Sequence, residues 1–411
     1  MKIVFAIDSF KGSLSSVQAG EAAAEGVHRV FPRAACVVRP LADGGEGTVD
    51  ALTAGLGGEL RRVTVTGPAG RPVACPYGVI GDTAVLEMAG AAGITLVSGA
   101  ARNPLRTTTF GVGEVIRDAL AQGCRRFVVG IGGSATNDGG AGMLQALGFR
   151  LLDADGRDIP RGGAGLARLV RIVRDDVPPE LSACVFQVAC DVTNPLCGPN
   201  GASAVFGPQK GATPEMVATL DAALAHFADI VEAEASRRDA ETQRFESRRK
   251  EEKQEELPQI LKLRASAPLR ETPGAGAAGG LGFAFKAFLG AELKRGVDLV
   301  LEVTDFERYA AAADVVVTGE GRLDAQTVMG KAPIGVARAA KKYDKPVIAF
   351  SGCVTPDARA VNGQGIDAFF PILRTVGTLE EALDVDHAAD NLSDTAEQVF
   401  RCLRLSERFS D

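Results

Sequence analysis

Carboxylates, lysines and glycines gather in six loops of this chain, and most of these loops follow an apolar run. The loops are DSFKGS (8–13), ADGGEGT (42–48), GIGGSATNDGG (130–140), CDVTNPLCGPNGA (190–202), PGAGAAGGLG (273–282) and TGEGRLDAQTVMGK (318–331). The chain has three histidines and none lies in these loops, so a general base has to be a carboxylate or a lysine. Carboxylates, glycine-rich loops and single bases suit phosphoryl transfer, which depends on positioning and charge neutralisation.

The loop at 130–140 allows two interpretations. Its Gly130-x-Gly132-x-x-Ala135 spacing fits a relaxed dinucleotide motif, and Asp153 lies about where a ribose-binding acid would follow. In that motif, however, 137–140 (Asn-Asp-Gly-Gly) would form the first helical turns, where each interior glycine costs about 1 kcal/mol. We therefore expect a longer loop with the helix starting near Ala141, so that hydroxyls and bare amides line an anion site.

Two further loops are less specific. Gly330 and Lys331 resemble the end of a P-loop, but Ala325 stands where its first glycine would be and Ala332 where its Ser or Thr would be. Lys331 is still available to meet a phosphate. PGAGAAGGLG offers a ligand only its backbone amides and room for close approach to the backbone. Tight packing between elements is the alternative explanation for its glycines.

The elements that position these loops alternate between strands and helices. Residues 3–7, 35–38, 314–317 and 346–350 are short apolar runs that each end at a loop, which predicts βαβ units and a parallel sheet. Residues 60–100 instead show short alternating runs with Gly and Pro turns, which predict antiparallel hairpins. We expect a discontinuous domain of residues 1–66 and 293–411, with residues 67–292 inserted as a second α/β domain.

Composition bounds the class of protein. At 411 residues with 46% hydrophobic content, two domains are expected. A net charge of −7 gives no field that would attract nucleic acid or an anionic membrane. The eight cysteines are scattered without a C-x-x-C pair, which predicts free thiols in a reducing compartment. The N-terminus is too short for a signal peptide and no stretch is apolar enough to span a membrane, so we expect a soluble, cytoplasmic protein.

One segment departs from this composition. Residues 232–265 alternate in charge and have almost no apolar periodicity. We interpret a charged excursion at about 232–271 as a solvated helix or a partly disordered segment. An arm that binds nucleic acid or a partner is the alternative, although acids and bases nearly balance and aromatic residues are almost absent.

At these loops the sequence resembles the bacterial type-1 glycerate kinase family. The resemblance rests on stretches that occur in the family's order across most of residues 1–375, namely DSFKGSLS, PLADGGEGT, RNPLRTTTFGVGE, GIGGSATNDGGAGMLQALG, CDVTNPLCGPNGASAVFGPQKGAT, PGAGAAGGLG and GEGRLDAQTVMGKAP. It implies a kinase that phosphorylates D-glycerate with ATP and Mg2+. It also implies a Rossmann-like parallel α/β domain with a second α/β domain inserted and the active site in the cleft between them. Where the family has a short connection, this chain carries about thirty additional residues before PGAGAAGGLG.

Roles for individual residues follow from glycerate's carboxylate and two hydroxyls. Catalytic roles are expected for Asp191, which we favour as the base, and for Lys11 and Asp8. Substrate contacts are expected from Ser9, Arg102, Arg322 and Asp324. Phosphate contacts are expected from Gly132, Gly133, Ser134, Thr136, Asn137, Gly276 and Lys331. Asp43 and Glu320 are the candidate Mg2+ ligands.

Several alternatives stay open at this point. An NAD-dependent hydroxy-acid dehydrogenase and a non-catalytic nucleotide or metabolite sensor are the competing functions. The resemblance favours 2-phosphoglycerate over 3-phosphoglycerate as the product. The expected partners are the small molecules D-glycerate and ATP, with no nucleic acid and no membrane. A homodimer, and the assignment of loops to ATP or glycerate, are left open.

Overall fold

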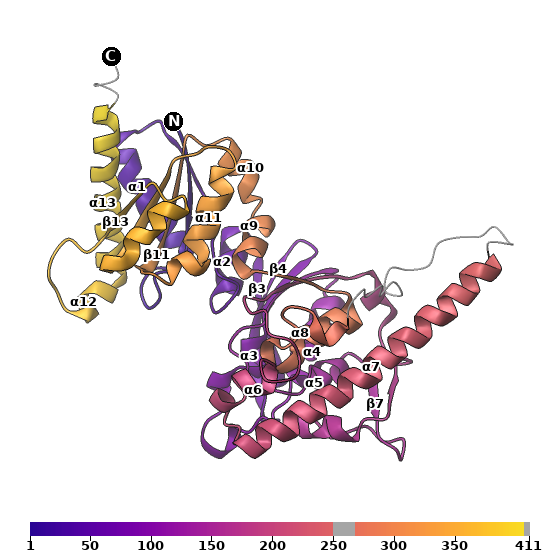
Figure 1. Ribbon diagram of the computed structural model, residues 1–411. Coiled ribbons are helices and arrows are strands. Elements are labelled where there is room, and N and C mark those ends of the chain that lie inside the picture. The colour runs from indigo at the N-terminus through magenta and orange to yellow at the C-terminus, as the bar shows by residue number, and fades with distance from the viewer. Residues whose placement is uncertain (250–267, 407–411) are drawn as a thin grey trace. The chain divides into compact units, whose positions relative to one another are not determined.

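The computed structural model describes residues 1–249 and 268–406, and the chain divides into two compact units (Figure 1). Unit 1 comprises Met1–Asp43, Asp50–Gly58 and Gly296–Asp411, and unit 2 comprises Gly44–Val49 and Glu59–Arg295. No helix in the described ranges is long and apolar enough to cross a membrane. All eight cysteines are free thiols, as predicted.

Unit 1 is built on a five-stranded sheet with the order β13-β12-β11-β1-β2, and every pair in it is parallel. Its strands are β1 (Lys2–Ile7), β2 (Ala35–Val38), β11 (Val315–Leu323), β12 (Val347–Val354) and β13 (Ala368–Pro371). The chain leaves β1 toward β2 on one side and returns as β11 on the other, so the strand order reverses between β1 and β11. Ligands of open α/β sheets bind outside the carboxyl ends of the strands at such a reversal.

Helices pack on this sheet because their apolar positions recur at helical spacing. α1 (Ser16–Val30) begins at a capping box formed by Ser15 and Gln18. It lies beside α13 (Val385–Ser406), as Figure 1 shows, and Gly26 permits this contact because a Cβ there would lie 2.0 Å from the Ser393 carbonyl oxygen. The other helices of this unit are α2 (Thr48–Gly55, shared at its start with unit 2), α9 (Gly296–Val303), α10 (Phe306–Ala311), α11 (Ala332–Lys341) and α12 (Leu379–Leu383).

Unit 2 contains a six-stranded mixed sheet with the order β10-β9-β6-β5-β4-β3. Its strands are β3 (Glu59–Thr66), β4 (Pro72–Ile80), β5 (Thr83–Glu87), β6 (Arg126–Gly130), β9 (Val185–Ala189) and β10 (Glu292–Lys294). β3, β4 and β5 pair antiparallel, which confirms the predicted hairpins, whereas β5, β6, β9 and β10 pair parallel. A separate antiparallel pair is formed by β7 (Arg150–Leu152) and β8 (Arg171–Val173).

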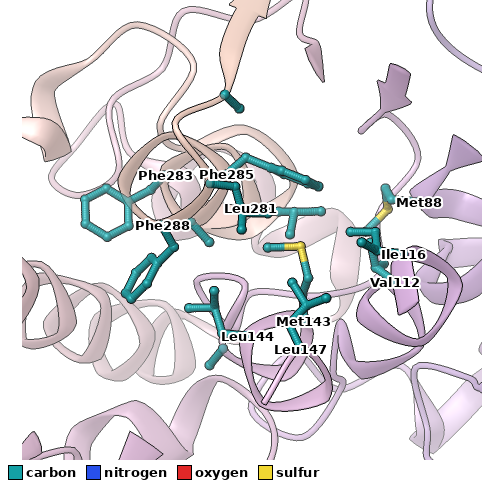
Figure 2. Packing of buried hydrophobic residues seen from close by; sticks show 14 of the residues in the cluster. Met88, Val112, Ile116, Met143, Leu144, Leu147, Leu281, Phe283, Phe285 and Phe288 are labelled. Atoms are coloured by element: carbon teal, nitrogen blue, oxygen red, sulfur yellow. The ribbon is translucent and has the colours of Figure 1, made fainter. Parts of the chain in front are cut away.

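The core of unit 2 lies between this sheet and its helices. Those helices are α3 (Met88–Ala92), α4 (Phe110–Ala121), α5 (Ala141–Ala146), α6 (Ala202–Phe206), α7 (Pro214–Arg249) and α8 (Ala277–Leu289). Figure 2 shows phenylalanines and Leu281 of α8 above Met143 and Leu144 of α5. On the sheet, Phe127 of β6 stacks on Phe186 of β9 with ring centroids 4.6 Å apart. Burial of these large side chains is what anchors the loop between β6 and α5.

The charged segment begins inside α7, which continues through Arg249. Residues 250–267 of the predicted excursion lie outside the described part of the chain. The two ends of the excursion meet, because the Arg270 guanidinium lies 2.7 Å from a Glu232 carboxylate oxygen and 2.5 Å from an Asp229 carboxylate oxygen. Arg270 also donates its backbone N–H to Glu232, so residue 270 lies on the surface of α7 at the position where the charged segment begins.

Candidate functional site

The reversal point of the unit 1 sheet holds a buried carboxylate, Asp8. Asp8 follows β1 directly, and its N–H donates to the Gly319 carbonyl of β11 at 2.9 Å. Its side chain is 8% exposed and accepts one hydrogen bond, from the Ser9 N–H at 2.7 Å. Burial, reinforced by the nearby Asp43 carboxylate, raises the pKa of Asp8 to about 7, although the Ser9 N–H and Lys11 act in the opposite direction.

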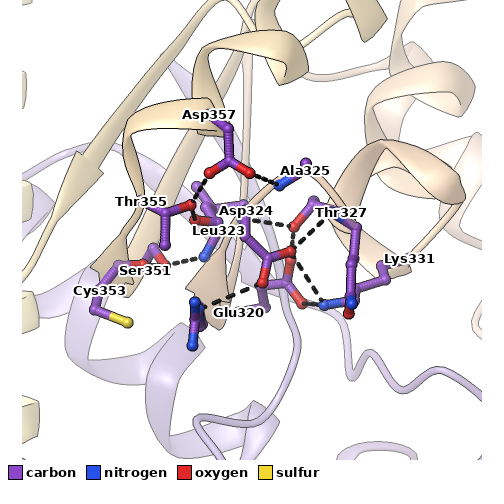
Figure 3. A network of polar contacts seen from close by, with 12 residues as sticks. Glu320, Leu323, Asp324, Ala325, Thr327, Lys331, Ser351, Cys353, Thr355 and Asp357 are labelled. Atoms are coloured by element: carbon purple, nitrogen blue, oxygen red, sulfur yellow. Dashed lines mark hydrogen bonds and ion pairs between the residues drawn. The ribbon is translucent and has the colours of Figure 1, made fainter.

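A second carboxylate, Glu320, lies in β11 beside Asp8 and anchors a polar network (Figure 3). Thr327 donates its hydroxyl to Glu320 Oε1 at 2.6 Å, and Thr327 belongs to the short 3-10 helix Thr327–Met329. Burial raises the pKa of the Glu320 carboxyl, while the hydrogen bond from Thr327 and the charge of Lys331 lower it. The Thr327 hydroxyl thus holds Glu320 in place, and the charge of Glu320 is compensated only in part by Lys331, whose ammonium is 4.0 Å away.

Basic side chains lie near these carboxylates but form only long ion pairs with them. The Lys331 ammonium lies 3.7 Å from Asp324 Oδ1 and 4.0 Å from Glu320 Oε2. Arg322 lies 3.4 Å from Asp324 Oδ2. The Lys11 ammonium is 3.9 Å from Asp43 Oδ2, and the Lys11 side chain is 70% exposed. Exposed pairs at such distances contribute little to stability, so these cations can turn to an anionic ligand at small cost.

The structure therefore brings one part of the predicted site together within unit 1. That part consists of Asp8, Ser9, Lys11, Asp43, Glu320, Arg322, Asp324 and Lys331. The loops of β1 and β11 supply most of it, which is the consequence of their being neighbours in the sheet. In the part of the chain that the structure describes, no three His, Cys, Asp or Glu side chains form a group that could hold a metal ion.

The other predicted residues belong to unit 2, where the loop between β6 and α5 carries most of them. α5 begins at Ala141, as predicted, and Gly140 before it has a left-handed conformation with φ 77°. A Cβ on Gly140 would lie 2.4 Å from the Ala284 Cβ, so this glycine is needed for packing against α8. Gly132 differs, because a Cβ there would have no atom within 4 Å and its φ lies outside the left-handed region. The internal packing of unit 2 thus gives no reason for a glycine at 132.

Asp138 organises the buried end of this loop. Its fully buried carboxylate accepts the Thr109 N–H at 2.8 Å, the Thr109 hydroxyl at 3.0 Å, and the Gly140 and Gly142 N–H groups at 3.2 and 3.3 Å. Burial raises the pKa of Asp138, and these hydrogen bonds act in the opposite direction. Asp138 therefore serves to hold the loop on α4 and α5, and its oxygens are occupied by that task.

Lys210 contacts this loop and was not predicted from the sequence. It ends the 3-10 helix Pro208–Lys210, is 2% exposed, and donates to the Ser134 hydroxyl and the Thr136 carbonyl, both at 2.7 Å. Its signal in the sequence is weak, because a single lysine in GPQKGAT is 74 to 76 residues away from its partners. Only tertiary structure places a cation under the loop.

Two more loop residues are placed by contacts within unit 2. Asn137 donates its side-chain amide to the Ser203 hydroxyl at 2.9 Å. Gly276 donates its N–H to the Asn194 carbonyl at 3.0 Å, and a Cβ there would lie 2.2 Å from the Pro195 carbonyl oxygen. Gly276 immediately precedes α8, which begins at Ala277 inside the predicted loop 273–282. It joins the start of this helix to the loop at 190–202, and its amide is already used in that contact.

Asp191 and Arg102 are both exposed side chains of unit 2. Asp191 is the second residue after β9, so it does lie at the carboxyl end of a strand as predicted. The backbone and stem of Arg102 lie against Gly211, the residue after Lys210.

Asp153 rules out the dinucleotide interpretation. It follows β7, which pairs with β8 and stands outside the six-stranded sheet. Its carboxylate accepts the N–H groups of Asp155 and Arg157 at 3.0 Å and pairs with Arg168 at 3.0 Å. These contacts lower the pKa of Asp153 and account for it as the cap of a local turn.

Comparison with known proteins shows which family the chain resembles. The model of the glycerate kinase family matches residues 3–404. A protein named glycerate kinase from Bacillus subtilis (strain 168) is 48% identical over 409 residues, covering 99% of each chain. One named glycerate 2-kinase from Escherichia coli (strain K12) is 45% identical over 410 residues, again covering 99% of each. A crystal structure from Salmonella typhimurium LT2, provisionally named glycerate kinase 2, superposes with a TM-score of 0.84 at 45% identity, covering 99% of both chains.

The two-unit α/β fold and these matches define a kinase, an enzyme that transfers a phosphoryl group to an alcohol. More particularly, the chain belongs to the glycerate kinase family.

Proposed function

We propose that this kinase phosphorylates the 2-hydroxyl of D-glycerate with ATP, in a reaction that depends on Mg2+. The observation that carries the proposal is the buried Asp8 carboxylate at the reversal point of the unit 1 sheet, bordered by the loosely paired cations Lys11 and Lys331. The name glycerate 2-kinase of the Escherichia coli relative supports the choice of the 2-hydroxyl.

Asp8 is proposed as the base that receives the proton of the attacking hydroxyl. The hydroxyl oxygen forms a bond to the γ-phosphorus, the bond from that phosphorus to the bridging oxygen breaks, and ADP leaves. Burial and a pKa near 7 suit a base that works at neutral pH. Asp191, which the sequence favoured for this role, is exposed, and it stays as the competing base.

The glycerate carboxylate is assigned to basic side chains. Lys11 and Arg322, with Ser9 and Asp324 beside them, are proposed for this contact in unit 1, and Arg102 is the candidate of unit 2. Lys11 and Arg322 have exposed side chains and only loose ion pairs. A planar guanidinium can bind a carboxylate through two hydrogen bonds, which a lysine cannot.

The phosphates are assigned to the loop after β6, with Lys331 of unit 1 as a further candidate. Gly132 and Gly133 would contribute N–H groups, and Ser134, Thr136 and Asn137 polar side chains. The open space around Gly132 supports this assignment. Gly276 is proposed to support the neighbouring loop at 190–202, since its own N–H is taken by Asn194.

Mg2+ is assigned to Asp43 and Glu320. The donor chemistry fits, because both are carboxylates, and the charge of Asp43 raises the pKa of Glu320, so they lie near one another. Mg2+ commonly takes one or two protein carboxylates and completes its shell with phosphate and water, so a group of three protein ligands is not required. When bound, the ion would neutralise charge on the transferred phosphate.

One assay tests this function against its competitors. ADP release is followed with and without D-glycerate, and NADH absorbance is recorded in parallel with NAD present. ADP release that depends on D-glycerate is expected. Glycerate-dependent NADH formation would instead indicate a dehydrogenase, and binding of ATP without turnover would indicate a sensor.

The position of the phosphate is tested on the product itself. In a proton-coupled 31P spectrum, a phosphate on C2 couples to one hydrogen and gives a doublet, whereas a phosphate on C3 couples to two and gives a triplet. A triplet would refute the proposed 2-phosphoglycerate while leaving the kinase activity intact.

A further inference from the structure

Lys210 is a buried cation for which the proposed mechanism has no role. Its side chain is 2% exposed in unit 2, and a lysine is seldom buried to this extent unless it is paired. Its ammonium donates to the Ser134 hydroxyl and to the Thr136 carbonyl, both at 2.7 Å. Both acceptors belong to the loop at 131–140, so the charge lies directly under the residues assigned to phosphate.

The direction of the hydrogen bond to Ser134 has a consequence for ligand binding. A protonated lysine has donors only, so the Ser134 oxygen must accept from it. The Ser134 hydroxyl hydrogen is then left for a different acceptor, and a phosphate oxygen is a strong one. If Lys210 loses its proton, its nitrogen can accept instead, and the Ser134 hydroxyl can turn inward toward it.

The same loop contains a second donor without an internal partner. The Thr136 hydroxyl is fully buried and has no hydrogen-bond partner among the described residues. An unsatisfied buried polar group destabilises the fold, and such a group is often retained where a ligand supplies the partner. Lys210 holds the carbonyl of this same residue, so it positions both hydroxyl-bearing residues of the loop.

The protonation of Lys210 is balanced near neutrality. Burial lowers its pKa to about 7, while the charge of Asp138 acts in the opposite direction. Asp138 is the carboxylate of the loop packed on Lys210, and Arg102 is the charged residue packed on the adjoining Gly211. An anion placed on the loop would favour the charged form of the lysine.

We propose that Lys210 is a positioning residue that charges the loop at 131–140 and turns the Ser134 hydroxyl outward, so that phosphate binding is coupled to uptake of a proton by Lys210. This inference rests on the proposed function, in which that loop receives the phosphates of ATP. The proton comes from the solvent and is released again when the nucleotide leaves.

The test is titration calorimetry of the full chain with ATP and Mg2+. Titrations at pH 8 in two buffers of different ionisation enthalpy report the number of protons taken up on binding. The variants are Lys210→Met, which removes the charge and keeps the length, and Lys342→Met, an exposed lysine of unit 1 paired with Glu307, as the matched control. Subtracting the Lys210→Met result removes any protonation of the nucleotide itself.

The wild type and the control are expected to take up more protons at pH 8 than Lys210→Met, and this excess should vanish at pH 6, where Lys210 is already protonated. Loss of the charge-assisted contacts should weaken ATP binding about 10- to 100-fold in Lys210→Met. Because the lysine acts through Ser134, adding Ser134→Ala to Lys210→Met should weaken binding little further.

Equal proton uptake in wild type and Lys210→Met would overturn the proposal, and so would fully additive losses in the double variant. If Lys210→Met fails to fold, the wild type alone tests the coupling. A wild type that takes up no more protons at pH 8 than at pH 6 also refutes it. Failure of the proposed function is distinct from this, since a wild type that gives no binding heat with ATP removes the function itself.

Discussion

Gly132 and Gly140 stand in the same loop, yet replacing each with alanine should have opposite effects. Gly140 has φ 77°, and a Cβ there would meet the Ala284 Cβ at 2.4 Å. Gly132 has no atom within 4 Å of its would-be Cβ and does not have a left-handed conformation. The first glycine is therefore required by the fold, and the second is free to serve a ligand.

The expected magnitudes follow from these two geometries. In Gly140→Ala, a left-handed alanine costs about 1–2 kcal/mol and the added methyl group overpacks α8 by about 1–3 kcal/mol. Stability should thus fall by about 2–5 kcal/mol, which lowers the Tm by at least about 4 °C for a unit of this size. Gly132→Ala should leave stability unchanged or raise it by about 0.4–1 kcal/mol, since alanine restricts the unfolded chain.

The assay combines thermal unfolding with steady-state kinetics. Melting is followed for wild type and both variants without ligand, and KM for ATP is then measured at saturating D-glycerate. In Gly132→Ala, the methyl group should hold a phosphate away from the amides of the loop and raise KM about 10- to 100-fold. Gly140→Ala should show its main effect in the melting curve.

Two outcomes would refute this reasoning. A large loss of stability in Gly132→Ala would mean that the space beside it is filled in the folded protein. A normal KM in a stable Gly132→Ala would mean that no phosphate approaches this part of the loop, and the nucleotide would then have to be sought at Lys331.

Three further predictions concern the carboxylates and the substrate. Asp8→Asn should lower kcat about 10²- to 10⁴-fold if Asp8 is the base, whereas Asp191→Asn should then lower it little; the reverse result in parallel kcat measurements would return the role to Asp191. The pKa of Asp8 is raised on folding from 3.8 to about 7, so ionising this carboxyl opposes folding. Relative to Asp8→Asn, the wild type should therefore lose up to about 4 kcal/mol of stability as pH rises from about 4 to about 7. Urea unfolding of both proteins without Mg2+ measures this difference, and equal pH dependence would contradict the burial of the charge. Arg102→Ala should raise KM for D-glycerate about 10-fold or more with little change in kcat, while Arg62→Ala, an exposed arginine of β3, serves as its control; an unchanged KM would place Arg102 outside the substrate site.

Features set by local sequence were predictable. Helix α5 begins at Ala141 because Gly139 and Gly140 both adopt positive φ and cannot continue a helix backward. The hairpins of β3, β4 and β5 followed from alternating apolar residues between Gly and Pro turns. Both inferences need only the covalent chain and its nearest neighbours, so one sequence was enough for them.

The chemical character of the loops was also evident, but the partners of each residue were not. The sequence placed Asp8, Glu320 and Lys331 in loops at strand ends, which was wrong for Glu320 because β11 extends through Leu323. The pairing of β1 with β11 made the two acids neighbours. The same sequence offered Asp153 as a ribose-binding acid, which was wrong, because its oxygens are taken by a turn and by Arg168. A motif specifies spacing along the chain, whereas hydrogen bonds depend on distance in space.

By itself, then, the sequence determined the α/β class, the hairpins, the family and the kind of chemistry, because these depend on residue types and local spacing. Only the tertiary structure decided which residues have shifted pKa values, since desolvation and Coulomb interactions depend on what surrounds a group. Lys210 became a buried lysine under the loop between β6 and α5, and Asp8 became a carboxylate with a pKa near 7. The tertiary structure also distinguished Gly140, which packing requires to be glycine, from Gly132, which packing does not.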